Sequence, residues 1–310
     1  MRYQITKPEH GSQEWLNVRW VDENGLTRIS ASVASAVHNE NKYTSAADLA
    51  MELLAEAPPT PQPTNAAMDR GNYMEPVLIK WTADVEGINL ITPDVMYCYN
   101  EHGARLIATL DAIDDNGIPY EVKTTNKKFT GVLPREWHWQ GVQQAICAGS
   151  ETIEWIIFDN EMQIKRYTQH ISSDDREYHI FKCQEFLADI DNGVPPAAAK
   201  LEYKHIESMY PESTAKQMAL PSEAAVIIEQ LDKVREMSKA LAEQESELKT
   251  QLGTMMQDAE EGTIDGNVVV TWKTQSRTSF DQKKFEAEHP ALVPKFRKTS
   301  TFRVMKTRSK

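Results

Sequence analysis

The sequence predicts an α+β protein, in which a central mixed sheet is flanked by helices and is followed by a long C-terminal helix and a small, basic, β-containing extension. Three observations predict this class. Helix-forming segments open the chain, strand-like runs with a hairpin signal occupy its middle, and a heptad-like apolar repeat runs through residues 221–259. Strands and helices that do not alternate strictly are typical of α+β domains.

The N-terminal part is expected to be helical over residues 12–57, which end in the strongly helix-forming run AADLAMELLAEA. The proline-rich run at 58–63 predicts a loop, because proline removes backbone donors and fixes φ. A second helix is expected over residues 66–85. The apolar side chains that share one face of it, at i, i+3, i+4 and i+7, are Met74, Val77, Leu78 and Trp81.

The middle of the chain predicts strands and two further helices. Strands are expected at 93–99, 104–114 and 118–125, and again at 154–159 and 163–170. Helices are expected at 135–148 and 174–192. The last helix ends at Gly193, before Pro195-Pro196, so we expect a first domain over residues 1–200 and an extension over residues 201–310.

The extension differs in character from the first domain. In the predicted helix at 221–259, Ile227, Leu231, Val234, Leu241, Leu248, Leu252 and Met255 alternate in steps of four and three. Ser238 and Glu245 occupy two positions of this stripe, which favours docking on another surface over a free-standing coiled coil. A strand follows at 267–273.

Composition and charge restrict the class of protein. The chain has no apolar N-terminal leader and no apolar run long enough to span a bilayer, so we expect a cytoplasmic protein. Its three cysteines are far apart, which predicts ordinary buried thiols. The net charge of -12 is unfavourable for binding nucleic acid, but the chain from Lys273 onward holds eleven basic and three acidic side chains. This basic end either contacts a polyanion or serves solubility.

A hairpin brings together the residues that indicate chemistry. Asp115-Asn116-Gly117 is a turn signal, and a three-residue loop there pairs Asp111 with Glu121. Directly opposed residues in an antiparallel pair point to the same face, and Lys123 shares that face because side chains alternate. Val122 then points into the core. The sequence therefore predicts two carboxylates and one ammonium side by side, whereas a two-residue loop would separate Asp111 from Glu121.

This triad predicts a metal site. Two adjacent carboxylates repel each other unless a cation lies between them, and oxygen ligands suit Mg²⁺, with Mn²⁺ as a possible substitute. Such a metal lowers the pKa of bound water and neutralises charge on a phosphate, while Lys123 can orient the attacking water or stabilise the transition state. For an isolated match, an exposed charged cluster is the simpler interpretation, so the surroundings decide.

Two neighbouring helices offer further candidates. Glu75, in the predicted helix at 66–85, can supply a third metal carboxylate, and Pro76 after it favours a start or kink of the helix there. Gln143 and Gln144 lie on the helix after the triad, where a glutamine facing the site can hold water or phosphate. The alternative for all of them is a solvated helix surface.

Taken together, these residues resemble the YqaJ-type viral recombinases, which belong with the phage lambda exonuclease in the PD-(D/E)xK nuclease superfamily. The resemblance covers residues 12–190. The residues that carry it are Trp15 and Arg19, Arg28-Ile29-Ser30-Ala31-Ser32, Arg70-Gly71 with Glu75, Asp111 with Glu121-Val122-Lys123, and Gln143. One departure is that Thr109-Leu110 precedes Asp111 where the superfamily has a proline.

The resemblance implies a restriction-endonuclease-like core in residues 1–200 and a Mg²⁺-dependent 5′→3′ exonuclease of a phage or prophage recombination system, acting in the bacterial host cytoplasm. It implies two-metal hydrolysis at double-stranded DNA ends that leaves 3′ single strands. The implied metal ligands are Glu75, Asp111, Glu121 and the Val122 carbonyl, and the implied catalytic residues are Asp111, Glu121, Lys123 and Gln143. Ser32, with either Arg19 or Arg28, would meet the 5′-phosphate.

The resemblance further implies a trimeric ring and a single-strand annealing protein as partner. Two alternatives stay open from the residues themselves. An endonuclease that recognises a DNA structure or sequence can use the same fold, and a non-catalytic scaffold that binds DNA ends can use the long helix.

Overall fold

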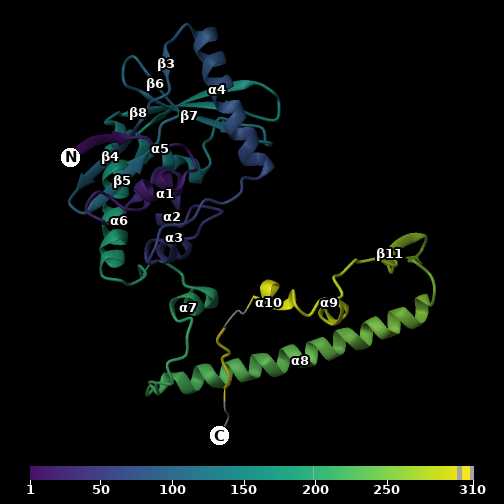
Figure 1. Ribbon diagram of the computed structural model, residues 1–310. Coiled ribbons are helices and arrows are strands. Elements are labelled where there is room, and N and C mark those ends of the chain that lie inside the picture. The colour runs from purple at the N-terminus through teal and green to yellow at the C-terminus, as the bar shows by residue number, and fades with distance from the viewer. Residues whose placement is uncertain (198, 299–301, 308–310) are drawn as a thin grey trace. The chain divides into compact units, whose positions relative to one another are not determined.

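The computed structural model describes residues 1–197, 199–298 and 302–307 (Figure 1). The chain divides into two compact units, Met1–Met209 and Tyr210–Lys310. None of the helices in these residues is long and apolar enough to cross a membrane.

The first unit contains two mixed sheets. A five-stranded sheet has the order β3 (Leu90–Ile91), β6 (Ala112–Asp114), β7 (Pro119–Thr124), β8 (Thr152–Phe158) and β9 (Ile164–His170), and only β7 and β8 in it are parallel. A four-stranded sheet has the order β1 (Arg2–Thr6), β4 (Val95–Glu101), β5 (Ala104–Ala108) and β2 (Ile29–Ser30), with β2 parallel to β5. The predicted α+β class with a mixed sheet is confirmed.

The strand predicted at 104–114 is two strands in different sheets. β5 ends at Ala108 and pairs with β4 and β2, whereas β6 begins at Ala112 and pairs with β7. Leu110 between them is fully buried. No glycine or proline interrupts residues 104–114, so the sequence pattern does not show the change of sheet. As a consequence, Asp111 lies at the junction of the two sheets.

The helical prediction for residues 12–57 is only partly correct. The segment contains α1 (Gln13–Trp20), the 3₁₀ turn η1 (Ala31–Val33), α2 (Ala34–Val37) and α3 (Ala46–Leu53). After α1, the Asp22 carboxylate accepts hydrogen bonds from the backbone N–H groups of Asn24 and Leu26, both at 2.9 Å. This local bonding turns the chain into β2, because an Asp side chain offers the backbone an alternative to helical hydrogen bonds.

Helix α4 (Ala66–Glu86) is one continuous helix with Pro76 inside it, so the helix does not start at Pro76. It packs on β7 and β8. Leu78 is buried, but Val77 is 53% exposed and Trp81 is 44% exposed, so the predicted apolar face is correct only in part. The buried side of α4 consists of Leu78, Ile79 and Thr82, with Met74 packed against the same cluster.

Helix α5 (Arg135–Ala148) connects the two sheets, since it packs against β4 and β5 of one and against β7 and β8 of the other. Gly141 permits this close packing: a side-chain carbon there would overlap Gln169 and lie 2.8 Å from the Trp155 ring. Helix α6 (Ser173–Asp191) covers α5 and β5, and α7 (Tyr203–Met209) packs on α3. Both α5 and α6 lie where the sequence predicts them, and the three cysteines are buried free thiols as expected.

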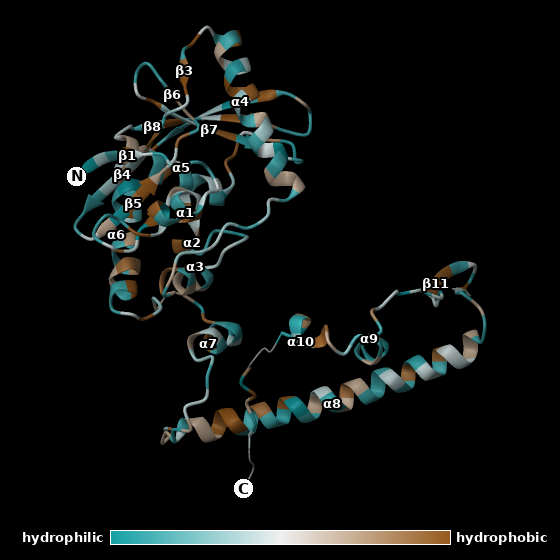
Figure 2. Cartoon of the chain, in the orientation of Figure 1, coloured by the Kyte–Doolittle hydropathy of each residue, from teal (hydrophilic) through white to brown (hydrophobic). Residues whose placement is uncertain are grey.

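The second unit begins with the long helix α8 (Glu223–Met256), close to the predicted range of 221–259. It continues with the hairpin of β10 (Glu261–Ile264) and β11 (Asn267–Thr271) and the short helices α9 (Gln282–Glu288) and α10 (Val293–Phe296). The apolar stripe of α8 is largely exposed, with Ile227 at 64% and Leu241 at 61%. Figure 2 shows apolar bands recurring along this helix.

Candidate active site

The hairpin that carries the predicted triad has the predicted three-residue turn. Ala112 pairs with Tyr120 and Ile113 with Pro119, and the Asp114 N–H donates to the Ile118 carbonyl at 3.2 Å. Gly117 has a φ of 79°, which glycine adopts without strain. Continuing this register by one residue places Asp111 opposite Glu121, as the sequence predicts.

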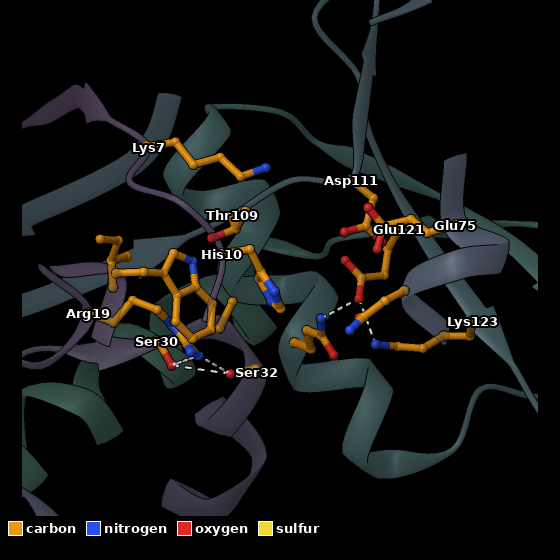
Figure 3. A pocket seen from close by; sticks show the side chains of 15 residues that line it. Lys7, His10, Arg19, Ser30, Ser32, Glu75, Thr109, Asp111, Glu121 and Lys123 are labelled. Atoms are coloured by element: carbon orange, nitrogen blue, oxygen red, sulfur yellow. Dashed lines mark hydrogen bonds and ion pairs between the residues drawn. The ribbon is translucent and has the colours of Figure 1, made fainter. Parts of the chain in front are cut away.

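The side chains of this hairpin open into a cavity of about 490 Å³ (Figure 3). One end, which we call the carboxylate pole, consists of Glu75, Asp111, Glu121, Lys123 and Gln140. The other end, which we call the arginine pole, consists of Trp15, Arg19, Ser30 and Ser32. Lys7, His10 and Thr109 lie between the two poles in Figure 3. The cavity thus joins residues of α1, β2, α4, β7 and α5 with the β5–β6 junction.

Glu121 is the most constrained residue of the carboxylate pole. It is 4% exposed, and its Oε1 accepts hydrogen bonds from Lys123 Nζ at 2.6 Å and from Gln140 Nε2 at 2.5 Å. Its Oε2 accepts a third from Gln144 Nε2 at 2.5 Å. Gln140 and Gln144 are four residues apart on α5 and therefore reach the same carboxylate from one helix face. Three donors hold this carboxylate in one orientation.

Asp111 is fixed by the backbone of the opposite strand. Its Oδ2 accepts a hydrogen bond from the Val122 N–H at 2.8 Å, and the Val122 side chain packs against the core beneath the sheet. Burial raises the pKa of Asp111 well above its usual value, and the nearby Glu121 and Glu75 carboxylates raise it further. The pKa of Glu75 is raised for the same two reasons, burial first and Glu121 second.

Lys123 balances only part of this negative charge. Burial disfavours its ammonium, but the carboxylates of Glu121 and Asp111 outweigh burial and raise the pKa of Lys123. Lys123 is therefore an ammonium near neutral pH. With three carboxylates around one ammonium, the pole carries an excess of negative charge that a cation would relieve.

The donor chemistry of the carboxylate pole fits a hard divalent cation, but the side chains do not form a closed cage. Within the described parts of the chain, no group of three or more His, Cys, Asp or Glu residues could hold a metal ion as the side chains stand. Mg²⁺ does not require such a cage, because it usually keeps several waters and binds one or two carboxylates together with substrate phosphate. The three carboxyl groups of Asp111, Glu75 and Glu121, which line one cavity, are the observation that favours a cation here.

At the arginine pole, the structure distinguishes the two candidate arginines. The Nη2 of Arg19 donates to Ser30 Oγ at 2.8 Å and to Ser32 Oγ at 2.5 Å, and the guanidinium lies over the Trp15 ring at 3.9 Å. Burial lowers the pKa of Arg19 to about 10, so it stays charged near neutral pH. Arg28 is 3% exposed, pairs with Glu23 at 3.3 Å and does not line the cavity.

Gln143, which the resemblance implies to be a catalytic residue, does not line the cavity. It is completely buried, and its Nε2 donates to the Ile29 carbonyl at 2.8 Å and to the Ile107 carbonyl at 3.0 Å. Its Oε1 contacts His179 Nε2 at 3.0 Å. Consecutive glutamines on a helix point about 100° apart, so Gln143 joins β2 to β5 while Gln144, the other glutamine considered, reaches Glu121.

Lys7, His10, Thr109 and Gln140 line the cavity but are not predicted from the sequence as site residues. Lys7 and His10 precede α1, and nothing in the local pattern shows that β1 lies beside β4. Thr109 is noted only as a departure from the family pattern. Gln140 has a usable signal, because it lies four residues before Gln144 and hence on the same helix face.

Comparisons with known proteins found one matching family model and several similar solved structures. Residues 14–151 match the model of the YqaJ-like viral recombinase domain. No curated protein matches the chain. An alkaline exonuclease from Laribacter hongkongensis is similar in structure, with 20% identity, a TM-score of 0.46, and coverage of 58% of this chain and 93% of that chain. A phage-related exonuclease from Haemophilus somnus 129PT has 11% identity, a TM-score of 0.41, and coverage of 54% and 96%.

The matched segment contains both poles of the cavity, from Trp15 and Arg19 to Gln140 and Gln144, but it excludes Lys7 and His10. The sequence resemblance is thus confirmed at the level of the domain. Residues 14–151 of this chain are therefore similar to the YqaJ-like viral recombinase domain.

Proposed function

We propose that the chain is a magnesium-dependent exonuclease that degrades double-stranded DNA from its 5′ ends and leaves 3′ single strands. The observation that carries this proposal is the two-pole cavity. A terminal phosphate dianion suits the Arg19 guanidinium with the Ser30 and Ser32 hydroxyls, and the carboxylate pole suits hydrolysis of the next phosphodiester. An enzyme that binds the terminal phosphate at the arginine pole would cut the strand at the carboxylate pole.

The residues of the carboxylate pole have distinct roles in this proposal. Asp111, Glu121, Glu75 and the Val122 carbonyl would hold Mg²⁺ or Mn²⁺, which lowers the pKa of a bound water and neutralises phosphate charge. Lys123 keeps its proton because its pKa is raised, so it acts as a donor and not as a general base. It orients the attacking water or stabilises charge on the phosphate. Gln140 and Gln144 hold Glu121 in place.

The test of the function is a duplex labelled at its ends, with either a 5′-phosphate or a 5′-hydroxyl, sampled over time with Mg²⁺. We expect shortening from the 5′ end that is faster with the phosphate and stops with a chelator. A closed circular duplex is the control, and it should remain intact. Cutting of the circle would instead support the endonuclease.

Substitution of Lys123 separates an enzyme from a DNA-end-binding scaffold. We expect Lys123→Ala to slow cleavage by about 100-fold or more, because it removes a charged donor from the transition state, while DNA binding in Ca²⁺ remains. Lys127→Ala, in an exposed loop four residues later, is the matched control. Cleavage that is unaffected by Lys123→Ala would contradict the mechanism.

We further propose, from the YqaJ-like domain, that the enzyme acts in a phage or prophage recombination system with a single-strand annealing protein as its partner. Co-purification of the two proteins, compared with an unrelated single-strand-binding protein as control, tests this partner.

A further inference from the structure

Lys7 is held at the edge of the cavity by the backbone. Its N–H donates to the Asp94 carbonyl at 2.9 Å, directly after the pairing of Thr6 with Val95 at the end of β1. The half-buried side chain extends into the cavity between the two poles (Figure 3). The backbone position from which the Lys7 side chain extends is therefore set by the four-stranded sheet.

Lys7 differs from the other two cations of the cavity in having no partner. Lys123 is paired with Glu121, and Arg19 is hydrogen-bonded to Ser30 and Ser32. Among the described residues, no hydrogen bond or ion pair involves the Lys7 ammonium. A half-buried ammonium without a partner has lost part of its hydration without compensation, which is tolerated where a ligand supplies the missing acceptor.

The charge of Lys7 acts on one residue beside each pole, His10 and Glu75. Its charge contributes to the lowered pKa of His10, after burial and Arg19, and it opposes the rise in the pKa of Glu75. His10 lies against Trp15 at a ring distance of 4.6 Å, beside the arginine pole, whereas Glu75 belongs to the carboxylate pole. Lys7 lines the same cavity as both of these residues.

We propose that Lys7 is a substrate-binding residue whose ammonium contacts the phosphodiester that is cut. This inference rests on the proposed function, because it takes the terminal phosphate to bind at Arg19. In an exonuclease that releases one nucleotide, the scissile phosphate is the next one along the strand, and it must lie where the carboxylate pole can reach it. Lys7 supplies a donor to its non-bridging oxygens from outside the triad.

The test compares Lys7→Met and Lys7→Arg with Lys80→Met, which alters an exposed lysine of α4 that is paired with Asp84 outside this cavity. Single-turnover cleavage is measured on duplexes with 5′-phosphate and 5′-hydroxyl ends. We expect Lys7→Met to slow cleavage by about 10- to 100-fold on both, leaving the preference for phosphate intact. Lys7→Arg should recover most of the rate, and Lys80→Met should match the unmodified protein.

Two further measurements make the outcome decisive. Affinity for DNA is measured over a range of salt concentrations. The slope of log affinity against log salt should become shallower in Lys7→Met by about the amount that one phosphate contact contributes, and it should stay unchanged in Lys80→Met. Thermal melting checks that each variant is folded, with Lys7→Gln as a second neutral variant. Equal rates for Lys7→Met and Lys80→Met overturn the proposal, as does a loss of phosphate preference in Lys7→Met. If the unmodified protein cuts no DNA, the proposed function itself fails.

Discussion

At the scale of single residues, Arg19 owes its position to three neighbours. Trp15 supports the face of the guanidinium, and Ser30 and Ser32 accept its hydrogen bonds. These contacts fix the orientation of the guanidinium before any ligand arrives. Preorganisation of this kind increases affinity, because less side-chain freedom is lost on binding.

We expect Arg19→Lys to reduce the preference for a 5′-phosphate by about 10- to 100-fold, because an ammonium cannot make the paired contacts of a guanidinium. The ratio of cleavage rates on 5′-phosphate and 5′-hydroxyl duplexes measures the effect. Arg28→Lys is the control, since Arg28 lies outside the cavity. A reversed result, with Arg28→Lys losing the preference, would contradict the assignment of Arg19.

The buried histidines predict a dependence of stability on pH. Burial lowers the pKa of His38 to about 4, although Glu40 opposes this shift, and burial lowers the pKa of His179 well below its usual value. The unfolded chain therefore binds more protons than the folded one between about pH 4 and the ordinary histidine pKa of about 6.5. Stability should be fully present above pH 6.5 and should decrease as the pH falls towards 4.

The measurement is the melting temperature between pH 4 and 7, for the unmodified protein and for His38→Phe. The phenyl ring keeps the stack on Trp139, whose ring lies 3.7 Å from that of His38, but it cannot titrate. We expect a shallower pH dependence in the variant. An identical dependence would show that other groups cause the acid sensitivity.

At the scale of elements, the three glutamines of α5 have two different roles. Gln140 and Gln144 hold Glu121, and Gln143 joins the two strands that lead to Ser30 and to Asp111. The hydrogen bonds of Gln143 also determine which ring nitrogens of His179 and His38 carry the proton. Because carbonyls only accept, the Gln143 amide nitrogen donates, so its Oε1 accepts from His179 and the His179 Nδ1 accepts from His38.

We expect Gln143→Leu to lower the free energy of unfolding by at least about 1–3 kcal/mol, because it leaves buried carbonyls and an imidazole N–H without partners. Gln140→Leu should affect turnover more than stability, since Gln140 lines the cavity. Urea unfolding and cleavage rates of the two variants distinguish these roles. Unchanged stability of Gln143→Leu would argue against its part in joining the strands.

The elements also show what the sequence could and could not predict. The turn at Asp115–Gly117 was predictable with its register, because turn chemistry and side-chain alternation act over a few residues. The division of residues 104–114 between two sheets was not predictable, because no glycine or proline marks the end of the first strand. The place of Gln143 was missed for a similar reason, since adjacent polar residues on a helix differ only in which neighbour they meet.

At the scale of the whole molecule, the charge is unevenly distributed. The net charge is -12, although eleven basic and only three acidic residues follow from Lys273 onward. Enclosure of DNA by several copies would reconcile an acidic chain with a polyanionic substrate, because an acidic exterior can surround a cationic channel.

We therefore expect light scattering to give three times the 35.2 kDa mass of one chain, as a trimeric ring requires. The measurement is repeated at high salt to exclude charge-driven association. A monomer at the concentrations used for cleavage would contradict the enclosure of DNA by a ring.

The position of Asp111 has a consequence for synthesis of the protein. Because Asp111 lies between β5 of one sheet and β6 of the other, its place is defined only once both sheets exist. The glutamines that orient Glu121 follow later still, on α5. A chain still emerging from the ribosome, or one with a single sheet formed, lacks the assembled carboxylate pole. The proposed cleavage of DNA would therefore require both sheets and α5 to be in place.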